Sequence, residues 1–386
     1  MTSHGPAAPQ TLLMFSESRN GADMRHATGV AMHDPFLYAE HEGNRYAVIT
    51  GFEVPLLLEV GIDARSLEQC GLDEFLAEGR SRADARIEAY VRGVQQLGIA
   101  SAVVPPSFPL QLAERLRAVG VSLAVDGELF DDRRRAKTDA QLAGIRKAQR
   151  AAEAGMDAAS AILAGARIEG TKLFFGSELL TSELLKEAII EAFERHGATG
   201  EEMIVAHGAQ IYGHDLGSGP IGPSEPIVID IWPRDPVSGC YADMTRTFVV
   251  GAIDEEIATY QRLVREALKR ATDGVRAGVR AQAVFERVCA WFGEHGYATE
   301  LTKQPGTVLK SGFFHGLGHG VGLEMHERPF LARSSDVLVA GDVVTLEPGL
   351  YRDGYGGCRL EDVVRVGEDG AEVLTDYPYD LLPRAA

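Results

Sequence analysis

The sequence predicts an α+β protein of two domains, the larger of which contains an internal duplication. The chain has 386 residues, more than one compact core usually holds. Hydrophobic residues make up 45% and charged residues 24%, a balance typical of globular proteins. In the later part, two pairs of amphipathic helices alternate with two pairs of apolar strands. We therefore expect a smaller α/β domain over residues 1–135 and a duplicated α+β domain over 136–386.

The smaller domain is predicted from short apolar runs and one helical pattern. Tyr46–Thr50 and Ala102–Val104 have the length and β-branched content of strands. Apolar residues at helical spacing predict a helix over Ala83–Leu97. The basic run Asp131–Lys137 contains acidic residues and precedes a helix, so we expect a solvated linker there.

The larger domain is predicted from helix signals and strand-like runs. Thr138 and Gln141 have the spacing of a capping box, which predicts the start of a long helix. Three further helices and two strand pairs follow in alternation. The helices are expected over 184–193, 254–273 and 281–292, and the strand pairs over 227–250 and 343–366.

Composition and charge exclude several classes of function. The formal net charge is -18, and phosphate binding needs clustered Lys and Arg, so nucleic acid is not an expected partner. The four cysteines form no C-x-x-C pair, which argues against a disulfide framework or a structural zinc site. The N-terminal residues lack a signal-peptide pattern, and no apolar run is long enough to span a bilayer. We therefore expect a cytoplasmic protein with reduced thiols and no membrane anchor.

Four acidic residues stand in apolar, strand-like surroundings, where an unpaired carboxylate is costly. They are Asp230, Asp243, Glu347 and Glu361. A single such residue would be explained by a solvated strand end or by pairing with Arg246 or Arg359. Four of them in two similar hairpins, at spacings of 13 and 14 residues, are harder to explain in that way. The pattern indicates oxygen ligands for hard divalent ions.

A glycine-rich segment offers nitrogen donors close to these carboxylates. Residues 314–327 contain His315, His319 and His326 among alternating glycines, which permit close backbone approach. A lone histidine is more often structural, whereas three within twelve residues favour a site. The G-x-G-x-x-G match at 217–222 is rejected as a dinucleotide motif because it contains a proline and precedes a strand.

At these residues the chain resembles the pita-bread metallopeptidases, which include Xaa-Pro aminopeptidases, prolidases and methionine aminopeptidases. Five motifs occur in the family's order. They are Asp230, Asp243–Phe248, Gly318–Leu323 with His326–Pro329, Leu346–Tyr351 and Arg359–Asp362. More weakly, Asp23–Gly29 looks like the opening of the N-terminal domain that the Xaa-Pro and creatinase branches carry. The resemblance implies a pita-bread catalytic domain after a creatinase-like domain, and it favours the Xaa-Pro peptidase branch.

The resemblance implies a centre of two divalent metal ions. Asp230 would bind one ion, His319 and Glu347 would bind the other, and Asp243 and Glu361 would bridge both. Two such ions about 3.5–4 Å apart can share a water and supply hydroxide near neutral pH. Manganese is the first expectation, with cobalt, zinc and iron as alternatives.

The same resemblance implies catalytic and substrate-binding residues. Glu347 would orient or deprotonate the water, and His326 would hydrogen-bond the scissile carbonyl as negative charge develops. His214 would lie on the substrate side, and His315 would be a further histidine of the pocket. Arg359 is expected to lie at the pocket and to orient a carboxylate.

Trp232 marks a departure from the family pattern. It stands where the family often has a small residue, in a hairpin longer than is usual, so we expect it to contact and narrow the substrate pocket. The expected activity is hydrolysis of the bond before proline in short Xaa-Pro peptides, by an aminopeptidase or a dipeptidase that forms a homodimer. Two alternatives stay open: a hydrolase or lyase of the same fold acting on a small non-peptide metabolite, and a non-catalytic binding module.

Overall fold

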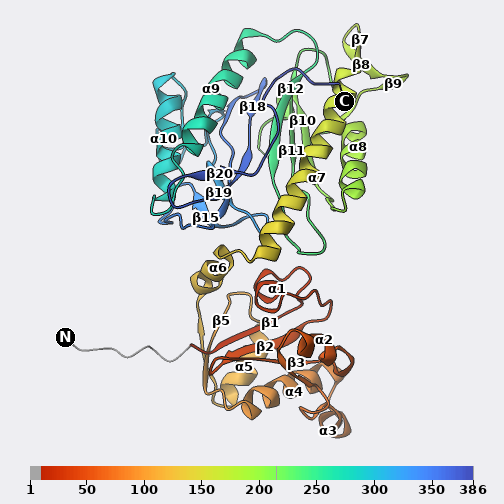
Figure 1. Cartoon of the computed structure of the whole chain (residues 1–386), viewed down its shortest axis with the longest axis vertical. Coiled ribbons are helices and arrows are strands. Elements are labelled where there is room, and N and C mark those ends of the chain that lie inside the picture. The colour runs from red at the N-terminus through yellow and green to blue at the C-terminus, as the bar shows by residue number, and fades with distance from the viewer. Residues whose placement is uncertain (1–9, 214, 386) are drawn as a thin grey trace, which may run out of the picture. The chain divides into compact units, whose positions relative to one another are not determined.

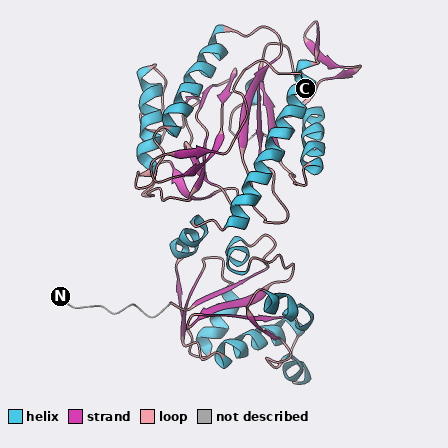
Figure 2. Ribbon diagram, viewed as in Figure 1, coloured by secondary structure: helices cyan, strands magenta, loops and turns pink. Residues whose placement is uncertain are grey.

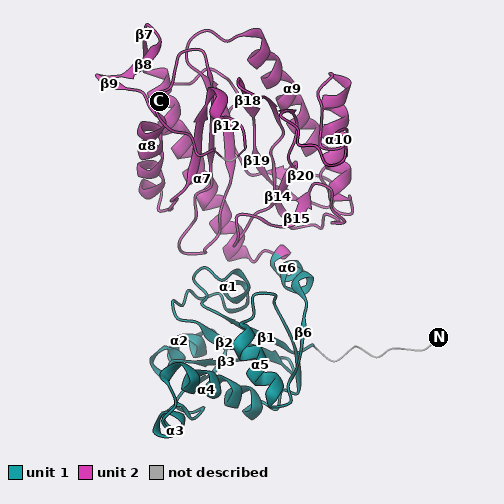
Figure 3. Cartoon of the chain, turned by 180° about the vertical axis from the view of Figure 1, so that it is seen from behind, with its two compact units in different colours: residues 1–134 teal, residues 135–386 magenta. Residues whose placement is uncertain are grey.

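The computed structural model describes residues 10–213 and 215–385. It divides into two compact units, residues 1–134 and residues 135–386 (Figure 3). Both units contain helices and strands, as the ribbon coloured by secondary structure shows (Figure 2). Within the described ranges, no helix combines the length and the apolar character that crossing a membrane requires.

The first unit is built on a six-stranded mixed sheet in the order β4-β3-β2-β1-β5-β6. Strands β1, β2 and β3 pair antiparallel, whereas β4, β5 and β6 join by parallel pairing. Two apolar clusters are buried in this unit. The strands are β1 Leu12–Ser16, β2 Phe36–His41, β3 Asn44–Ile49, β4 Asp63–Ser66, β5 Ser101–Val104 and β6 Ser122–Val125. The helices are α1 Ala22–Thr28, α2 Val54–Glu59, α3 Leu72–Ala77, α4 Arg82–Gln96, α5 Leu110–Ala118 and α6 Gly127–Arg135, with the 3-10 turn η1 Gly51–Glu53.

The second unit begins with two packed helices and an antiparallel three-stranded sheet (Figure 1). The predicted capping box of Thr138 and Gln141 is confirmed at the start of α7. Apolar residues of the helices and of the sheet's outer face form one buried core. The elements are α7 Asp139–Ala164, α8 Ser182–Arg195, β10 Met203–His207, β11 Pro226–Ile231 and β12 Met244–Val249, with a small sheet of β7 Arg167–Glu169, β8 Lys172–Phe175 and β9 Glu178–Leu179 and the 3-10 turn η2 Gly208–Gln210.

The pattern then recurs with a second helix pair and a second set of strands, as the sequence predicted. Their apolar residues form the other large core of this unit. The helices are α9 Glu255–Thr272 and α10 Ala281–Glu294. The strands form one sheet of β13 Ser311–Gly312, β17 Gly349–Arg352 and β18 Gly356–Arg359, and another of β15 Glu327–Leu331, β14 Gly318–Gly320, β16 Val343–Leu346, β19 Asp362–Val366 and β20 Ala371–Val373.

The region 343–366 differs from the two strand-like runs predicted for it. It forms four short strands, because β16 pairs with β19 whereas β17 pairs with β18 in a different sheet. The chain changes sheets at Glu347–Pro348 and at Leu360–Glu361. Proline lacks the N–H that a continuous strand needs, so the first run ends there. Both carboxylates therefore stand at strand breaks and not within strands.

The start of the second unit contradicts the solvated linker predicted for the basic run. Arg135 and Lys137 are nearly buried, with side-chain exposures of 10% and 5%. Arg135 donates to both carboxylate oxygens of Asp342, at 2.9 and 2.7 Å, and Lys137 pairs with Glu327. These partners lie 207 and 190 residues further along the chain, so the local pattern of charges could not indicate them.

Candidate metal centre

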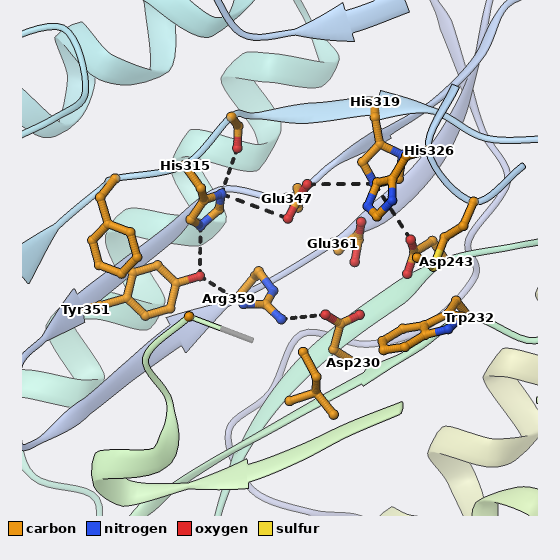
Figure 4. A pocket seen from close by; sticks show the side chains of 15 residues that line it. Asp230, Trp232, Asp243, His315, His319, His326, Glu347, Tyr351, Arg359 and Glu361 are labelled. Carbon is orange, nitrogen blue, oxygen red and sulfur yellow. Dashed lines mark hydrogen bonds and ion pairs between the residues drawn. The ribbon is translucent and has the colours of Figure 1, made fainter. Parts of the chain in front are cut away.

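Asp230 stands in an apolar strand, yet its side chain lines a pocket, because successive side chains of a strand point to opposite faces. On β11, Ile227, Ile229 and Ile231 pack into the core with α7 and α8. Side chains of a strand alternate between its two faces, so Asp230 and Trp232 lie on the opposite face. Both line one pocket, together with residues from the second set of strands (Figure 4).

The same alternation operates around Glu361. Cys358 and Leu360 belong to the core that contains α9 and α10. Arg359 and Glu361, which alternate with them, line the pocket. The two halves of the duplication therefore each bury an outer face against helices and present carboxylates from the inner face.

Three of the predicted ligands lie close enough to hold one cation. Asp243, His319 and Glu361 are buried, and each offers a ligand atom within 4.8 Å of the other two. His319 Nε2 is 3.8 Å from Asp243 Oδ2 and 3.9 Å from Glu347 Oε1. Its Nδ1 donates a hydrogen bond of 3.0 Å to the carbonyl of Gly320, which leaves Nε2 with its lone pair toward the carboxylates. His319 stands on the short strand β14 within the glycine-rich segment.

Two of the carboxylates contain buried oxygen atoms without a hydrogen-bond partner. These are Oδ1 of Asp230 and Oδ1 of Asp243. The other oxygen of Asp230 accepts a hydrogen bond from Arg359. A buried acceptor without a partner costs about 1–3 kcal/mol, and more when it is charged. The donor set of carboxylates and one imidazole fits a divalent ion that would satisfy these atoms.

The electrostatics of the donor set also favour a bound cation. Burial, followed by the charges of neighbouring carboxylates, raises the pKa of Asp243 and of Glu361 well above the ordinary range. Burial also raises the pKa of Glu347 to about 8. Burial and the nearby His326 lower the pKa of His319 to about 4, so its imidazole is neutral at pH 7, as a metal ligand must be. A bound cation would stabilise the ionised carboxylates that the protein alone disfavours.

Thr245 contacts both Glu361 and Arg359, and the sequence did not single it out. Its hydroxyl donates a hydrogen bond of 2.8 Å to the Glu361 carboxylate and accepts one of 3.3 Å from Arg359. Thr245 lies opposite Asp230 in the β11–β12 register. Its position two residues after Asp243, on the same face of the hairpin, was the available signal.

Tyr351 is a second pocket residue that the sequence reasoning did not single out. Its hydroxyl accepts a hydrogen bond of 3.1 Å from Arg359 and lies 2.9 Å from His315 Nε2. His315 Nδ1 lies 2.7 Å from the carbonyl of Gly316, so this nitrogen carries the hydrogen and Tyr351 donates to Nε2. Burial raises the pKa of Tyr351 to about 12, which keeps its hydroxyl protonated. The sequence places Tyr351 four residues after Glu347, inside one of the recognised motifs.

The pocket is a cavity of about 350 Å³ that contains nearly all the predicted site residues. The ring of His326 lies 4.2 Å from that of His319, centroid to centroid. His214 lies outside the described residues. One wall of the pocket is apolar, and Trp232 forms part of it. Ile204, Phe314 and Met325 also line the pocket with apolar side chains.

The chain is similar to known metallopeptidases in sequence and to solved structures in fold. The sequence model of metallopeptidase family M24 matches residues 143–368. The chain is 38% identical over 142 residues to the Xaa-Pro dipeptidase of Pyrococcus furiosus, an alignment that covers 36% of this chain and only 37% of that protein. It is 29% identical over 289 residues to the putative dipeptidase YkvY of Bacillus subtilis, covering 73% of this chain and 72% of the relative. The solved structure of an Xaa-Pro dipeptidase from Bacillus anthracis matches with a TM-score of 0.77 at 21% identity, over 97% of this chain and 94% of the other. This likeness confirms the predicted α+β fold class.

Proposed function

The chain belongs to metallopeptidase family M24, and from this premise we propose that it is a metal-dependent exopeptidase acting on Xaa-Pro peptides. The observation that carries the proposal is the convergence of four carboxylates and His319 on one pocket. Two of these carboxylates hold buried oxygens that lack a partner, as a site built for cations would.

We assign five residues to two divalent ions. Asp230 would bind one ion, His319 and Glu347 the other, and Asp243 and Glu361 would bridge the two. When bound, the ions would lower the pKa of a shared water and polarise the scissile carbonyl. The close approach of Asp243, His319 and Glu361 supports this assignment. We propose manganese as the native metal, with cobalt, zinc and iron as candidates that satisfy the same ligand set.

The protein's own groups would handle the proton and the developing charge. Glu347 would accept a proton from the attacking water, a role that suits its place at the edge of the pocket, where its side chain is 21% exposed. His326 would donate a hydrogen bond to the scissile carbonyl oxygen as negative charge develops. Arg359 would keep Asp230 oriented, and Tyr351 with His315 would complete a fixed polar wall for the substrate.

The substrate is proposed to be a dipeptide or short peptide with proline in second position. The Pyrococcus furiosus, Bacillus subtilis and Bacillus anthracis relatives carry dipeptidase names, which favours a dipeptidase over an aminopeptidase. Trp232 would contact the substrate and limit its size, because its side chain lies in the apolar wall beside the proposed ligands.

We propose three further properties of the chain. The chain would act as a homodimer, a proposal that rests on the family resemblance. Residues 1–135 would form the creatinase-like domain and 136–386 the catalytic domain, in keeping with the two compact units. A cytoplasmic location is supported by four cysteines that are all buried and unpaired.

The proposal is tested by metal removal and a defined substrate panel. Protein treated with a chelator should lose activity and regain it with Mn²⁺ or Co²⁺. The reconstituted enzyme should cleave Xaa-Pro dipeptides and be tested in parallel on Xaa-Pro-Yaa tripeptides and on Xaa-Ala controls. Cleavage of dipeptides alone indicates a dipeptidase, and cleavage of the longer peptides indicates an aminopeptidase. Failure of the metal-loaded enzyme to cleave either class contradicts the proposal and would direct attention to a small non-peptide metabolite.

A further inference from the structure

A buried ion pair lies beside the turn that carries His326. Residues 321–326 join β14 to β15, and the last two of them line the pocket. Glu327 follows directly, and its carboxylate accepts a hydrogen bond of 3.4 Å from the backbone N–H of Glu324. The same carboxylate pairs with Lys137, and the side chains of this pair are only 2% and 5% exposed. The Glu327 carboxylate thus connects the backbone of the turn to Lys137.

The surroundings leave this ion pair little room to move. A Cβ at Gly322 would lie 2.6 Å from Oε1 of Glu327 and 2.9 Å from Cε of Lys137, so a larger residue there would displace the pair. The carbonyl of Gly322 accepts a hydrogen bond of 2.8 Å from the N–H of Tyr241, which fixes the turn from its other side. Because Glu327 is the next residue after His326, a fixed carboxylate limits the directions in which His326 can point.

We propose that Lys137 is a positioning residue for hydrolysis, which holds His326 in its place in the pocket by pairing with Glu327. The inference rests on the proposed function, in which His326 contacts the scissile carbonyl. Lys137 does not line the pocket. Without its ammonium group, the buried carboxylate of Glu327 loses the cation with which it pairs, and removing one partner of a buried ion pair is strongly unfavourable. Glu327 then turns toward water, and His326 moves with it.

Arg135 provides a matched control two residues earlier in the same segment. Its guanidinium pairs with the buried carboxylate of Asp342, with side-chain exposures of 10% and 0%. Asp342 also accepts a hydrogen bond of 2.8 Å from the N–H of Val339, so it closes a turn as Glu327 does. That turn does not line the pocket. Loss of Arg135 should therefore loosen a turn without moving His326.

The test compares Lys137→Met with Arg135→Met by steady-state kinetics and by hydrogen exchange followed peptide by peptide. Lys137→Met should lower kcat about tenfold or more and change KM less than about threefold, because His326 acts on charge that develops in the transition state. Exchange should rise in the peptide 321–331. Arg135→Met should raise exchange around residues 337–342 and leave kcat within about twofold of the wild type.

A second variant tests whether the fall in kcat comes from the broken Lys137–Glu327 pair or from the loss of the Lys137 side chain itself. In the double variant Lys137→Met with Glu327→Gln, two neutral side chains replace the buried ion pair, and the amide oxygen can still accept from the N–H of Glu324. It should recover kcat to within about threefold of the wild type. If Lys137→Met fails to fold, Glu327→Gln alone should raise exchange in 321–331 and lower kcat.

Three results would overturn the proposal: unchanged kcat and exchange in Lys137→Met, an equal fall of kcat in Arg135→Met, or no recovery in the double variant. The exchange measurements are repeated on chelator-treated protein. They report on the turn even if the wild-type enzyme cleaves no Xaa-Pro peptide, so a failure of the proposed function is distinguishable from a failure of this inference.

Discussion

Thr245 and Glu361 are joined twice across the two halves of the duplicated unit. The Thr245 hydroxyl donates to the Glu361 carboxylate at 2.8 Å, and the Thr245 carbonyl accepts from the Glu361 N–H at 3.1 Å. A carboxylate that would bridge two cations is thus held in place by a residue of the other hairpin. The proposed metal centre depends on the contact between the two halves as much as on the ligands themselves.

Replacing Thr245 with valine should weaken metal binding while preserving the fold. The substitution keeps the side-chain shape but removes the hydroxyl that orients Glu361, and loss of such a contact costs about 10–100-fold in metal affinity. Titration calorimetry with Mn²⁺ measures the change. Thr247→Val is the control, because the Thr247 hydroxyl forms hydrogen bonds of 2.9 and 3.1 Å with the backbone of Arg359 and does not line the pocket. An affinity loss in the control as large as that in Thr245→Val would contradict the assigned role.

Arg246 donates hydrogen bonds to the backbone carbonyls of both Thr245 and Glu361. Replacing Arg246 with lysine should destabilise the protein. The side chain is 1% exposed, and its five N–H groups donate to one carboxylate and four backbone carbonyls. The acceptors are Pro378, Thr245, Glu361, Tyr377 and Asp362. Lysine cannot reproduce this planar set of donors, so the free energy of unfolding should fall by about 3 kcal/mol or more.

Urea unfolding measures that loss, and Arg365→Lys provides the control. Arg365 lies on β19, and its side chain is 44% exposed. Its substitution should change the free energy of unfolding by less than about 0.5 kcal/mol. Equal effects of the two substitutions would refute the role of Arg246.

The stability of the chelated protein should fall as pH rises from 6.5 to 8. Burial raises the pKa of Glu347 from its ordinary 4.5 to about 8, so the folded state binds more protons than the unfolded state between these values. The free energy of unfolding then decreases with pH. His319 contributes with the opposite sign, because its pKa is lowered from 6.5 to about 4, and this contribution fades as the pH rises above 6.5.

Above pH 6.5 the carboxyl contribution therefore exceeds that of His319. Each such group should contribute about 1.4 kcal/mol per pH unit. Urea unfolding at several pH values, with and without Mn²⁺, tests the expectation. The metal-loaded protein should lack this decline, since cations favour the ionised carboxylates. A chelated protein equally stable at pH 6.5 and pH 8 would contradict the pKa of Glu347.

Trp232 should restrict the size of the substrate. Trp232→Ala enlarges the pocket beside the proposed ligands, so peptides with a bulky first residue should gain relative to small ones. The ratio of kcat/KM for Phe-Pro to that for Ala-Pro should rise about tenfold. The chain's other tryptophan, Trp291, is the control, since it lies outside this pocket and donates a hydrogen bond to Leu263. Trp291→Ala should leave the ratio unchanged. An unchanged ratio in Trp232→Ala would contradict the proposal that Trp232 limits the size of the substrate.

The sequence predicted the parts of the site that depend on strand periodicity and on unusual charge placement. Asp230 was recognisable because an acid stood in an otherwise apolar strand. The order of helix pairs and strand pairs was recognisable because each element buries one face.

Features that depend on distant partners were not predictable in this way. Glu347 stands where the chain changes sheets, and nothing in its local run shows which strands pair. Lys137 lies 190 residues from Glu327, and its neighbours suggested a solvated segment. Thr245 and Tyr351 are ordinary strand residues until the register brings them to Glu361 and Arg359.

The most direct test of the metal centre is the number of Mn²⁺ ions that each chain binds. The chelator-treated protein is reconstituted with Mn²⁺, unbound metal is removed, and the bound metal is measured by elemental mass spectrometry. Two ions per chain are expected, falling to one or none in Glu361→Gln, because that carboxylate is proposed to touch both. One ion or none in the wild type, or two ions retained by Glu361→Gln, would contradict the bridged two-metal centre.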